Sequence, residues 1–299
     1  MRSTLFITGA SGFVGTNLVE SMKSSDFRLV CPVRPGSDIS RLKGKCEIRV
    51  IGRPEDLPRL FEEERPSGVI HLATLFQASH SYGTLIPMLE SNVEFGTCVL
   101  EAASCAGTRW FLNIGTFWQN YCGEPGNPVN FYAATKEAFE SIGRWYGKTG
   151  RLCFTTLALN DTYGPGDRRR KIFNLLREAV AERKHLDMSP GEQVMDMLYV
   201  DDVTDAIRLL ASYLEQAPGK YNCDRFYISA EEKYTLRRLV GLFSEICGET
   251  PDISWGGRPY REREVMLPAC CGKPLPGWKQ KVSFREGLAR FLKDLKKDE

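Results

Sequence analysis

Short apolar segments alternate with amphipathic stretches through the first half of the chain, and this alternation constrains the fold more than any other feature. The apolar segments are bounded by turn residues, which is typical of buried strands. Strands that alternate with helices form right-handed crossovers and a parallel sheet covered on both faces. We therefore predict a doubly wound α/β domain. The predicted strands are residues 4–10, 27–33, 46–52, 68–73, 109–115 and 151–159, and the predicted helices are 12–25, 54–66, 85–107 and the segment around Tyr132.

The character of the sequence changes after the segment "YGPGD", which ends at Asp167. Longer polar helices and shorter strands follow, and the passage from Gly256 to Gly277 is rich in glycine and proline. We predict a first domain over residues 1–165, rejoined by about 194–226, and a smaller C-terminal lobe made mainly of 166–299. The predicted helices of this half are 171–184, 201–216, 235–248 and 283–297, and the predicted strands are 193–200 and 225–230.

The charge of the chain is nearly balanced, with 40 Lys and Arg against 38 Asp and Glu. No overall field therefore draws the protein toward nucleic acid or an anionic membrane surface, and small molecules are the expected partners. The run "DRRRK", Asp167 to Lys171, is predicted to be solvated surface, because charged residues mostly lie outside. No segment approaches the roughly 18 apolar residues that a membrane span needs.

Ten cysteines are scattered along the chain without a CxxC pair or a regular framework. This usage is typical of reduced thiols and indicates a cytoplasmic protein. The N-terminal apolar run is too short for a secretory signal and is followed at once by a glycine-rich turn. No metal site is expected, because His71, His80 and His185 are far apart and lack Cys or carboxylate partners at ligand spacing.

Gly9, Gly12 and Gly15 follow the first predicted strand and open the first predicted helix, in the segment "TGASGFVG". Glycine allows positive φ values and a close approach of the backbone to a pyrophosphate, whose charge the free N–H groups of a helix start stabilise. Glycines also end strands for structural reasons, so the spacing alone is a modest signal. Its position at the start of an alternating α/β chain favours a dinucleotide site, and we predict that residues 1–165 form a Rossmann domain.

The end of the second predicted strand bears on the choice of cofactor, because the residue there meets the adenosine ribose about 20 positions after the glycines. A carboxylate would accept the 2′-hydroxyl of NAD(H) and would repel a 2′-phosphate. This chain has Arg34 at that position, with Ser37 and Arg41 just beyond. Because arginine is a forked and always charged partner for phosphate, we predict NADP(H) over NAD(H).

Tyr132 and Lys136 are separated by one helical turn in "NFYAATKEAFE", so they share one face of a predicted helix. Such a pair is common by chance, but here the glycine turn precedes it and Thr116 ends the fifth predicted strand. A nearby ammonium, or the positive nicotinamide of an oxidised cofactor, is expected to lower the pKa of the phenol toward the working range. We predict Tyr132 as proton donor, Lys136 as its partner and a ligand of the nicotinamide ribose, and Thr116 as the residue that orients a substrate carbonyl.

In order and spacing, the motifs of this chain resemble those of the extended short-chain dehydrogenase/reductase (NAD-dependent epimerase/dehydratase) family. The later segments "SPGEQVMDMLYVDDV" and "RPYREREVMLPA" are most similar to CDP- or dTDP-4-keto-deoxyhexose reductases of the abequose and paratose synthase type. The chain departs from the family pattern at Thr74, where alanine is usual, at Asp161 and Met195, and by one extra residue after Asn92. Besides Tyr132 and Lys136, the resemblance rests on "TGASGFVG", "HLAT", "NVEFGT", "NIGTFWQ", "NDTYGPGD", "LYVDDV" and "LPGWKQKVSFREGL".

The resemblance implies a substrate-binding role for the C-terminal lobe and a set of contacts. Members of the family usually pair through a four-helix bundle, which here would use the helix before Gly107 and the Tyr132 helix, so a homodimer is expected. The implied substrate contacts are Phe117, Trp118, Gln119, Asp161, Arg258 and Arg263. The implied cofactor contacts are Thr8, Gly9, Ser11, Gly12, Phe13, Val14, Gly15, Arg34, Ser37, Leu72, Ala73, Thr74, Asn92, Tyr132 and Lys136.

The resemblance also implies a nucleoside-diphosphate sugar as substrate, and the residues after Thr116 narrow the chemistry. In related 4,6-dehydratases an acidic pair follows the threonine, whereas Phe117, Trp118 and Gln119 follow it here and none is a general acid or base. We therefore predict NADPH-dependent reduction of the C4 keto group of a CDP- or dTDP-linked 4-keto-6-deoxyhexose in deoxysugar biosynthesis. An NAD-dependent nucleotide-sugar epimerase is the alternative, and a non-catalytic dinucleotide-binding regulator on the same fold is a more distant one.

Overall fold

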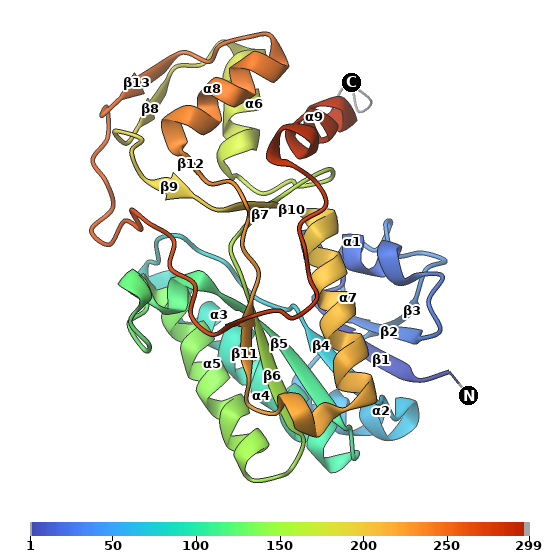
Figure 1. Ribbon diagram of the computed structural model, residues 1–299. Coiled ribbons are helices and arrows are strands. Elements are labelled where there is room, and N and C mark those ends of the chain that lie inside the picture. Colours follow the sequence, from blue (N-terminus) through green and yellow to red (C-terminus); the bar gives the residue numbers. More distant parts are fainter. Residues whose placement is uncertain (1, 296–299) are drawn as a thin grey trace.

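A parallel β-sheet forms the centre of the computed structural model, which describes residues 2–295 (Figure 1). Its strands are β1 (Thr4–Thr8), β2 (Arg28–Val33), β3 (Glu47–Val50), β4 (Gly68–His71), β5 (Trp110–Thr116), β6 (Cys153–Leu159), β11 (Arg225–Tyr227) and β14 (Lys273–Pro274). They are arranged in the order β14-β11-β6-β5-β4-β1-β2-β3, and all their pairings are parallel. From β1 the chain adds β2 and β3 on one side, and then returns to add β4, β5 and β6 on the other side. The boundary between β1 and β4 is therefore a topological switch point, where open α/β sheets bind ligands.

Helices cover both faces of this sheet and bury two separate hydrophobic cores. On one face lie α1 (Phe13–Met22) and α7 (Val200–Gln216), whose apolar sides share a core with β1, β2 and β5. On the other face lie α2 (Leu57–Glu64), α4 (Phe95–Cys105) and α5 (Phe131–Lys148), which pack around a core rich in phenylalanine. The predicted doubly wound α/β class is therefore confirmed.

The predicted helix 85–107 is built from three consecutive pieces. α3 (Tyr82–Leu89) continues into a π-helical turn (Glu90–Glu94) and then into α4. A π turn holds one residue more than an α turn, so it accommodates the extra residue that follows Asn92. Gly96 then meets α5 so closely that a Cβ there would lie 2.5 Å from Phe139 Cε2.

The smaller lobe lies beyond the carboxyl end of β6, at the top of Figure 1. Its helices α6 (Ile172–Glu182), α8 (Leu236–Cys247) and α9 (Phe284–Leu295) enclose a third apolar core. Its short strands pair as β7 (Asp161–Tyr163) with β10 (Met197–Tyr199), β8 (Leu186–Met188) with β13 (Ile253–Trp255), and β9 (Val194–Met195) with β12 (Tyr234–Thr235). The 3₁₀ helices of the chain are η1 (Pro54–Asp56), η3 (Phe117–Gln119), η4 (Tyr121–Gly123) and η5 (Pro218–Tyr221).

The structure follows the sequence-based elements closely, with one interruption. The predicted strand 193–200 divides into β9 and β10 at Asp196, because this buried carboxylate accepts hydrogen bonds from Ser229 Oγ at 2.6 Å and from the Ala230 N–H at 2.8 Å. α7 lies within residues 194–226 and covers the sheet, and β11 begins within them and joins the sheet, while the domain boundaries themselves stay a prediction. Among the residues that the structure describes, no helix combines the length and apolar character that crossing a membrane requires.

Candidate functional site

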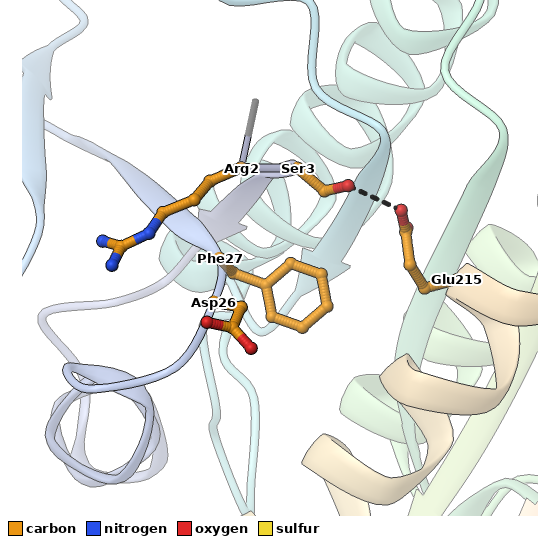
Figure 2. A pocket seen from close by; sticks show the side chains of 5 residues that line it. All are labelled: Arg2, Ser3, Asp26, Phe27 and Glu215. Atoms are coloured by element: carbon orange, nitrogen blue, oxygen red, sulfur yellow. Dashed lines mark hydrogen bonds between the residues drawn. The ribbon is translucent and has the colours of Figure 1, made fainter.

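The predicted functional residues gather at the carboxyl ends of the strands, whereas an open hollow lies at their amino ends. Figure 2 shows this hollow beside the starts of β1 and β2, lined by Arg2, Ser3, Asp26, Phe27 and Glu215. The Glu215 carboxylate already accepts bonds from Ser3 Oγ at 2.9 Å and Trp110 Nε1 at 2.8 Å. Because parallel sheets bind ligands at their carboxyl ends, we place the candidate site at the opposite end of the sheet.

The glycine turn leaves the start of α1 open to an anion. Gly9 has a φ of +68°, and a Cβ on Gly15 would lie 2.3 Å from the Gly9 carbonyl oxygen, so neither position tolerates a side chain. Gly12 is the N-cap of α1, and no side chain of the described residues caps this helix. Asn130 caps α5 and Thr235 caps α8, whereas α6 and α7 also begin without a side-chain cap, so the glycine turn is what sets α1 apart. The uncapped N–H groups of α1 therefore fit the pyrophosphate of a dinucleotide.

Thr8 and its neighbours shape the cofactor side of the sheet from within. The Thr8 side chain is fully buried, and its Oγ1 lies 2.8 Å from His71 Nδ1 and accepts the Ala73 N–H at 3.3 Å. Val14 and Leu72 pack against the core shared with α1 and α7. Thr8, predicted as a cofactor contact, thus fixes the end of β4 against β1, while Ser11 and Gly12 are exposed.

Asn92 holds the loop after β4 in place. Its Oδ1 accepts bonds from Thr74 Oγ1 at 3.0 Å and from the Leu75 N–H at 2.6 Å, and its Nδ2 donates to the Leu75 carbonyl and to Thr135 Oγ1. Because these bonds occupy the whole amide, Asn92 supports the predicted cofactor site indirectly. Thr74, where the family pattern has alanine, also lies near enough to Tyr132 to lower the pKa of its phenol.

The predicted phosphate-binding arginines lie at the end of β2. Arg34 is exposed, and its carbonyl accepts the Ser37 N–H at 3.1 Å in a tight turn. Arg41 is half-buried and packs against the backbone of Gly166, where an added Cβ would lie 2.5 Å from Arg41 Nη1. No side chain among residues 2–295 pairs with the Arg34 guanidinium, which can therefore bind a ligand, whereas Arg41 lies against a loop of the smaller lobe.

Tyr132 and Lys136 occupy the first two turns of α5, and both are deeply buried. The side chains are 9% and 2% exposed, respectively. Burial raises the pKa of Tyr132 to about 12, although the neighbouring Thr74 side chain opposes this shift. Burial also lowers the pKa of Lys136 to about 8, against the influence of Glu140.

The expected lowering of the phenol pKa is therefore not produced by the protein groups that the structure describes. Desolvation disfavours the charged form of both side chains, and it is the largest influence on the pKa of each. The raised pKa suits a proton donor, because it keeps the Tyr132 phenol protonated at neutral pH. Lys136 stays mostly charged at pH 7, since its pKa of about 8 lies above that value.

Thr116 ends β5 with its hydroxyl group poised to donate. Its Oγ1 accepts the Trp118 N–H at 3.3 Å, which caps the short helix η3. No hydrogen bond among the described residues uses the hydroxyl hydrogen of Thr116. That hydrogen can therefore reach a carbonyl oxygen, as predicted for the orienting residue.

Gln119 was predicted as a substrate contact, but the structure places it beneath the site. Its side chain is 0% exposed, and its Oε1 accepts the Thr116 N–H at 2.9 Å. Its Nε2 donates to Glu137 at 2.9 Å and to Glu140 at 2.8 Å. With both ends of the amide bonded to the protein, we infer that Gln119 supports Thr116 instead of touching substrate.

An aromatic ring that the sequence analysis missed packs against Tyr132, and two more lie beyond it. Phe76 packs edge-on against Tyr132, with ring centroids 4.9 Å apart, and lies 5.8 Å from Trp118. Phe117 in turn contacts Trp118 at 6.0 Å. Phe76 lies in the loop after β4, five residues beyond His71, so its place beyond the carboxyl end of a strand was the available signal.

The run "DRRRK" is only partly the solvated surface that was predicted. Arg168 and Arg170 are exposed. However, Arg169 is held by Asp167 at 2.7 Å and stacks over the Phe13 ring at 4.5 Å, while Lys171 pairs with Asp161 at 2.8 Å. The surface prediction is wrong for Asp167, which is 7% exposed, and Arg169 and Lys171 are only partly exposed, because their loop crosses to the glycine turn and supplies partners that the sequence does not reveal.

The two predicted substrate arginines occupy different places. Arg263 stacks over Tyr121 at 4.4 Å and bonds Asn127, so it lies beside the loop that follows β5. Arg258 is exposed next to β8, and its N–H donates to the Met188 carbonyl at 3.3 Å. The structure thus brings only Arg263 close to the residues that follow Thr116.

The doubly wound sheet, the uncapped glycine-rich helix start and the buried Tyr132–Lys136 pair define a dinucleotide-binding enzyme of the Rossmann type. Residues 5–224 match the model of the NAD dependent epimerase/dehydratase family, and the chain belongs to this family. The predicted family is therefore confirmed.

Comparison with known proteins supports the same family at the level of whole chains. CDP-abequose synthase from Yersinia pseudotuberculosis is 28% identical over 268 residues, which cover 88% of this chain and 91% of that protein. CDP-abequose synthase from Salmonella typhimurium is 26% identical, with 99% of both chains covered. The structure of DesIV, a dTDP-glucose 4,6-dehydratase from Streptomyces venezuelae with NAD and TYD bound, superposes with a TM-score of 0.85 at 19% identity and covers 99% of this chain and 97% of that chain.

Proposed function

We propose that the protein reduces the C4 keto group of a CDP- or dTDP-linked 4-keto-6-deoxyhexose, with NADPH as the hydride donor. The observation that carries this proposal is a buried and protonated Tyr132 one turn from Lys136, together with the donor hydroxyl of Thr116 at the end of β5. The similarity to two CDP-abequose synthases supports a sugar nucleotide as substrate and makes the CDP-linked sugar the first to test.

In this mechanism the protein supplies orientation and a proton. The Thr116 hydroxyl donates a hydrogen bond to the substrate carbonyl oxygen and fixes its direction. The proton of Tyr132 moves to that oxygen as the cofactor, when bound, delivers hydride to the carbon. The phenolate that remains lies near Thr74, which lowers the Tyr132 pKa, and one helical turn from Lys136, which would also bind the nicotinamide ribose.

The residues around Thr116 disfavour dehydration. Phe117 and Trp118 carry no acid or base, and Gln119 is committed to backbone support. The carboxylates of this cluster, Glu137 and Glu140, are bonded to Gln119 and to Arg144, so they are not available for elimination chemistry. These features favour a reductase over a dehydratase.

The choice of NADPH rests on Arg34 and is tested by binding. We expect the wild-type protein to bind NADPH at least about tenfold more tightly than NADH, because a forked, charge-assisted bond to the 2′-phosphate is lost with NADH. Arg34→Ala should remove this preference, while Arg59→Ala, an exposed arginine on α2, should retain it. Equal affinity for both cofactors in the wild type would rule out the NADPH assignment.

The reaction is tested by turnover with CDP- and dTDP-4-keto-6-deoxy sugars. We expect stoichiometric loss of NADPH absorbance and a product that carries a C4 hydroxyl group. Thermal-shift screening of CDP-, dTDP-, GDP- and UDP-sugars in the presence of NADPH identifies the base. Protein that purifies with bound NAD and interconverts sugar nucleotides without consuming NADPH would be an epimerase instead.

We also propose a homodimer that forms through α3, α4 and α5. Tyr82, Ile86 and Leu89 form an exposed apolar stripe along α3, and Trp145 is half exposed on α5. Large apolar side chains gathered on neighbouring helices of one face favour burial against a second copy. The expected assembly is a four-helix bundle, to which each chain contributes the continuous helix made of α3 and α4 and the helix α5.

A further inference from the structure

A buried polar cluster lies directly beneath Thr116 and contains Gln119, Glu140 and Arg225. Glu140 is 2% exposed and accepts hydrogen bonds from Gln119 Nε2 at 2.8 Å, from Arg144 Nη1 at 3.1 Å and from Arg225 Nη1. Arg225 lies on β11 beside β6, so it reaches the site from a late part of the chain. Burying this many charged groups is unfavourable unless each finds partners, and here they do.

The cluster holds both backbone groups of Thr116. The N–H of Thr116 donates to Gln119 Oε1 at 2.9 Å, and its carbonyl accepts Arg225 Nη2 at 3.1 Å. Gly115 makes room for this arrangement, because a Cβ there would lie 2.8 Å from Gln119 Oε1 and 3.4 Å from Arg225 Nη1. The direction of the Thr116 side chain therefore depends on Gln119, Arg225 and, through them, Glu140.

The same carboxylate acts on Lys136, which lies one turn earlier on α5. Burial is the largest influence on the Lys136 pKa, while Glu140 raises this pKa and Arg225 lowers it. His71 on β4 also faces Lys136, but burial holds the pKa of that imidazole well below its usual value, so it is neutral. Glu140 is thus the acidic group that favours the Lys136 ammonium.

We propose that Glu140 is a positioning residue of the reaction, which orients Thr116 through Gln119 and Arg225 and provides the negative charge that Lys136 faces. This inference rests on the proposed function, since it assigns roles toward the same carbonyl and cofactor. A purely structural ion pair would stabilise the fold without setting the protonation of Lys136. The two roles are therefore separable by experiment.

The first test measures the Lys136 pKa directly, by NMR of the protein labelled with ¹³C at lysine Cε and assigned with Lys136→Arg. Glu140→Gln should lower the Lys136 pKa by roughly one unit, and Arg225→Met should raise it, because opposite charges are removed. Glu137→Gln is the matched control. It removes the same charge three residues earlier on α5, from a carboxylate that is not among the influences on the Lys136 pKa, and should leave that pKa unchanged.

The second test measures turnover of variants that retain wild-type NADPH affinity. Glu140→Gln should lower kcat at least about tenfold with little change in KM. The loss of activity as the pH rises should begin at a lower pH than in the wild type. Gln119→Met should lower kcat without moving the pH profile, because it removes the Thr116 contact but no charge.

An unchanged Lys136 pKa in both Glu140→Gln and Arg225→Met would overturn the inference, as would Glu140→Gln turnover equal to the wild type. If Glu140→Gln does not fold, the Lys136 pKa of Arg225→Met tests the inference: a raised pKa supports it and an unchanged pKa overturns it. A wild-type protein without reductase activity would refute the proposed function alone, because the NMR measurement still reports on Glu140 and Lys136.

Discussion

Replacement of Lys136 by methionine should make the protein more stable at neutral pH. The Lys136 pKa of about 8 lies below the ordinary lysine value of 10.5, so the folded protein releases this proton more readily than the unfolded chain does. Below pH 8 the buried charge therefore destabilises the fold, and this penalty disappears as the pH rises from 8 to 10.5. The difference between the two pKa values corresponds to about 3 kcal/mol.

We expect Lys136→Met to raise the free energy of unfolding at pH 7 by up to about 3 kcal/mol and to abolish turnover. The remaining cluster stays paired, since Glu140 keeps its bonds to Arg144 and Arg225. The assay is urea denaturation followed by tryptophan fluorescence at pH 7 and at pH 10.5. The gain in stability should be present at pH 7 and absent at pH 10.5.

Lys148→Met provides the control, because this lysine is exposed in the last turn of the same helix. It should be neutral or slightly destabilising, since a cation near a helix C-terminus is favourable. A Lys136→Met protein that is no more stable than the wild type at pH 7, or whose gain persists at pH 10.5, would refute the reasoning about the buried ammonium.

The other predictions concern the acid, the glycine turn and the assembly. Tyr132→Phe should lower kcat by at least roughly 10²-fold with NADPH affinity nearly unchanged, and an active variant would end the proton-donor assignment. Gly15→Ala should lower both the melting temperature and NADPH affinity, because its Cβ would lie 2.3 Å from a carbonyl oxygen, whereas Gly83→Ala, with open space around it, should change neither. Ile86→Arg combined with Trp145→Arg should yield a monomer in sedimentation; a wild-type monomer would contradict the proposed dimer.

The sheet and most of its helices could be predicted from the sequence because alternation of apolar and amphipathic segments is a local signal. The glycine turn and the Tyr132–Lys136 spacing were visible for the same reason. The pKa values of these residues could not be predicted in the same way. The spacing indicated a lysine near the phenol and hence a lowered Tyr132 pKa, but burial, which depends on the assembled fold, raises that pKa instead.

Contacts between distant segments account for what the sequence did not reveal. Arg225 reaches Thr116 only because β11 returns to the edge of the sheet beside β6, and no local pattern predicts that return. Gln119 lies three residues after Thr116, the predicted orienting residue, so it was interpreted as a substrate contact. Instead, its side chain is directed inward by hydrogen bonds with Arg225 and Glu140. The place of Glu140 near Lys136 could have been predicted, because it lies one helical turn beyond Lys136 on the same face of α5.

The central claim is that hydride passes from NADPH to the C4 carbon of a sugar nucleotide while Tyr132 supplies the proton. The most direct measurement is to incubate the protein with NADPH that carries deuterium at the transferable position and with a CDP-linked 4-keto-6-deoxy sugar, and to analyse the product by NMR and mass spectrometry. We predict one deuterium at C4 of a C4 alcohol, and none with Tyr132→Phe. A product without deuterium, or a changed sugar with NADPH left unconsumed, would contradict the account.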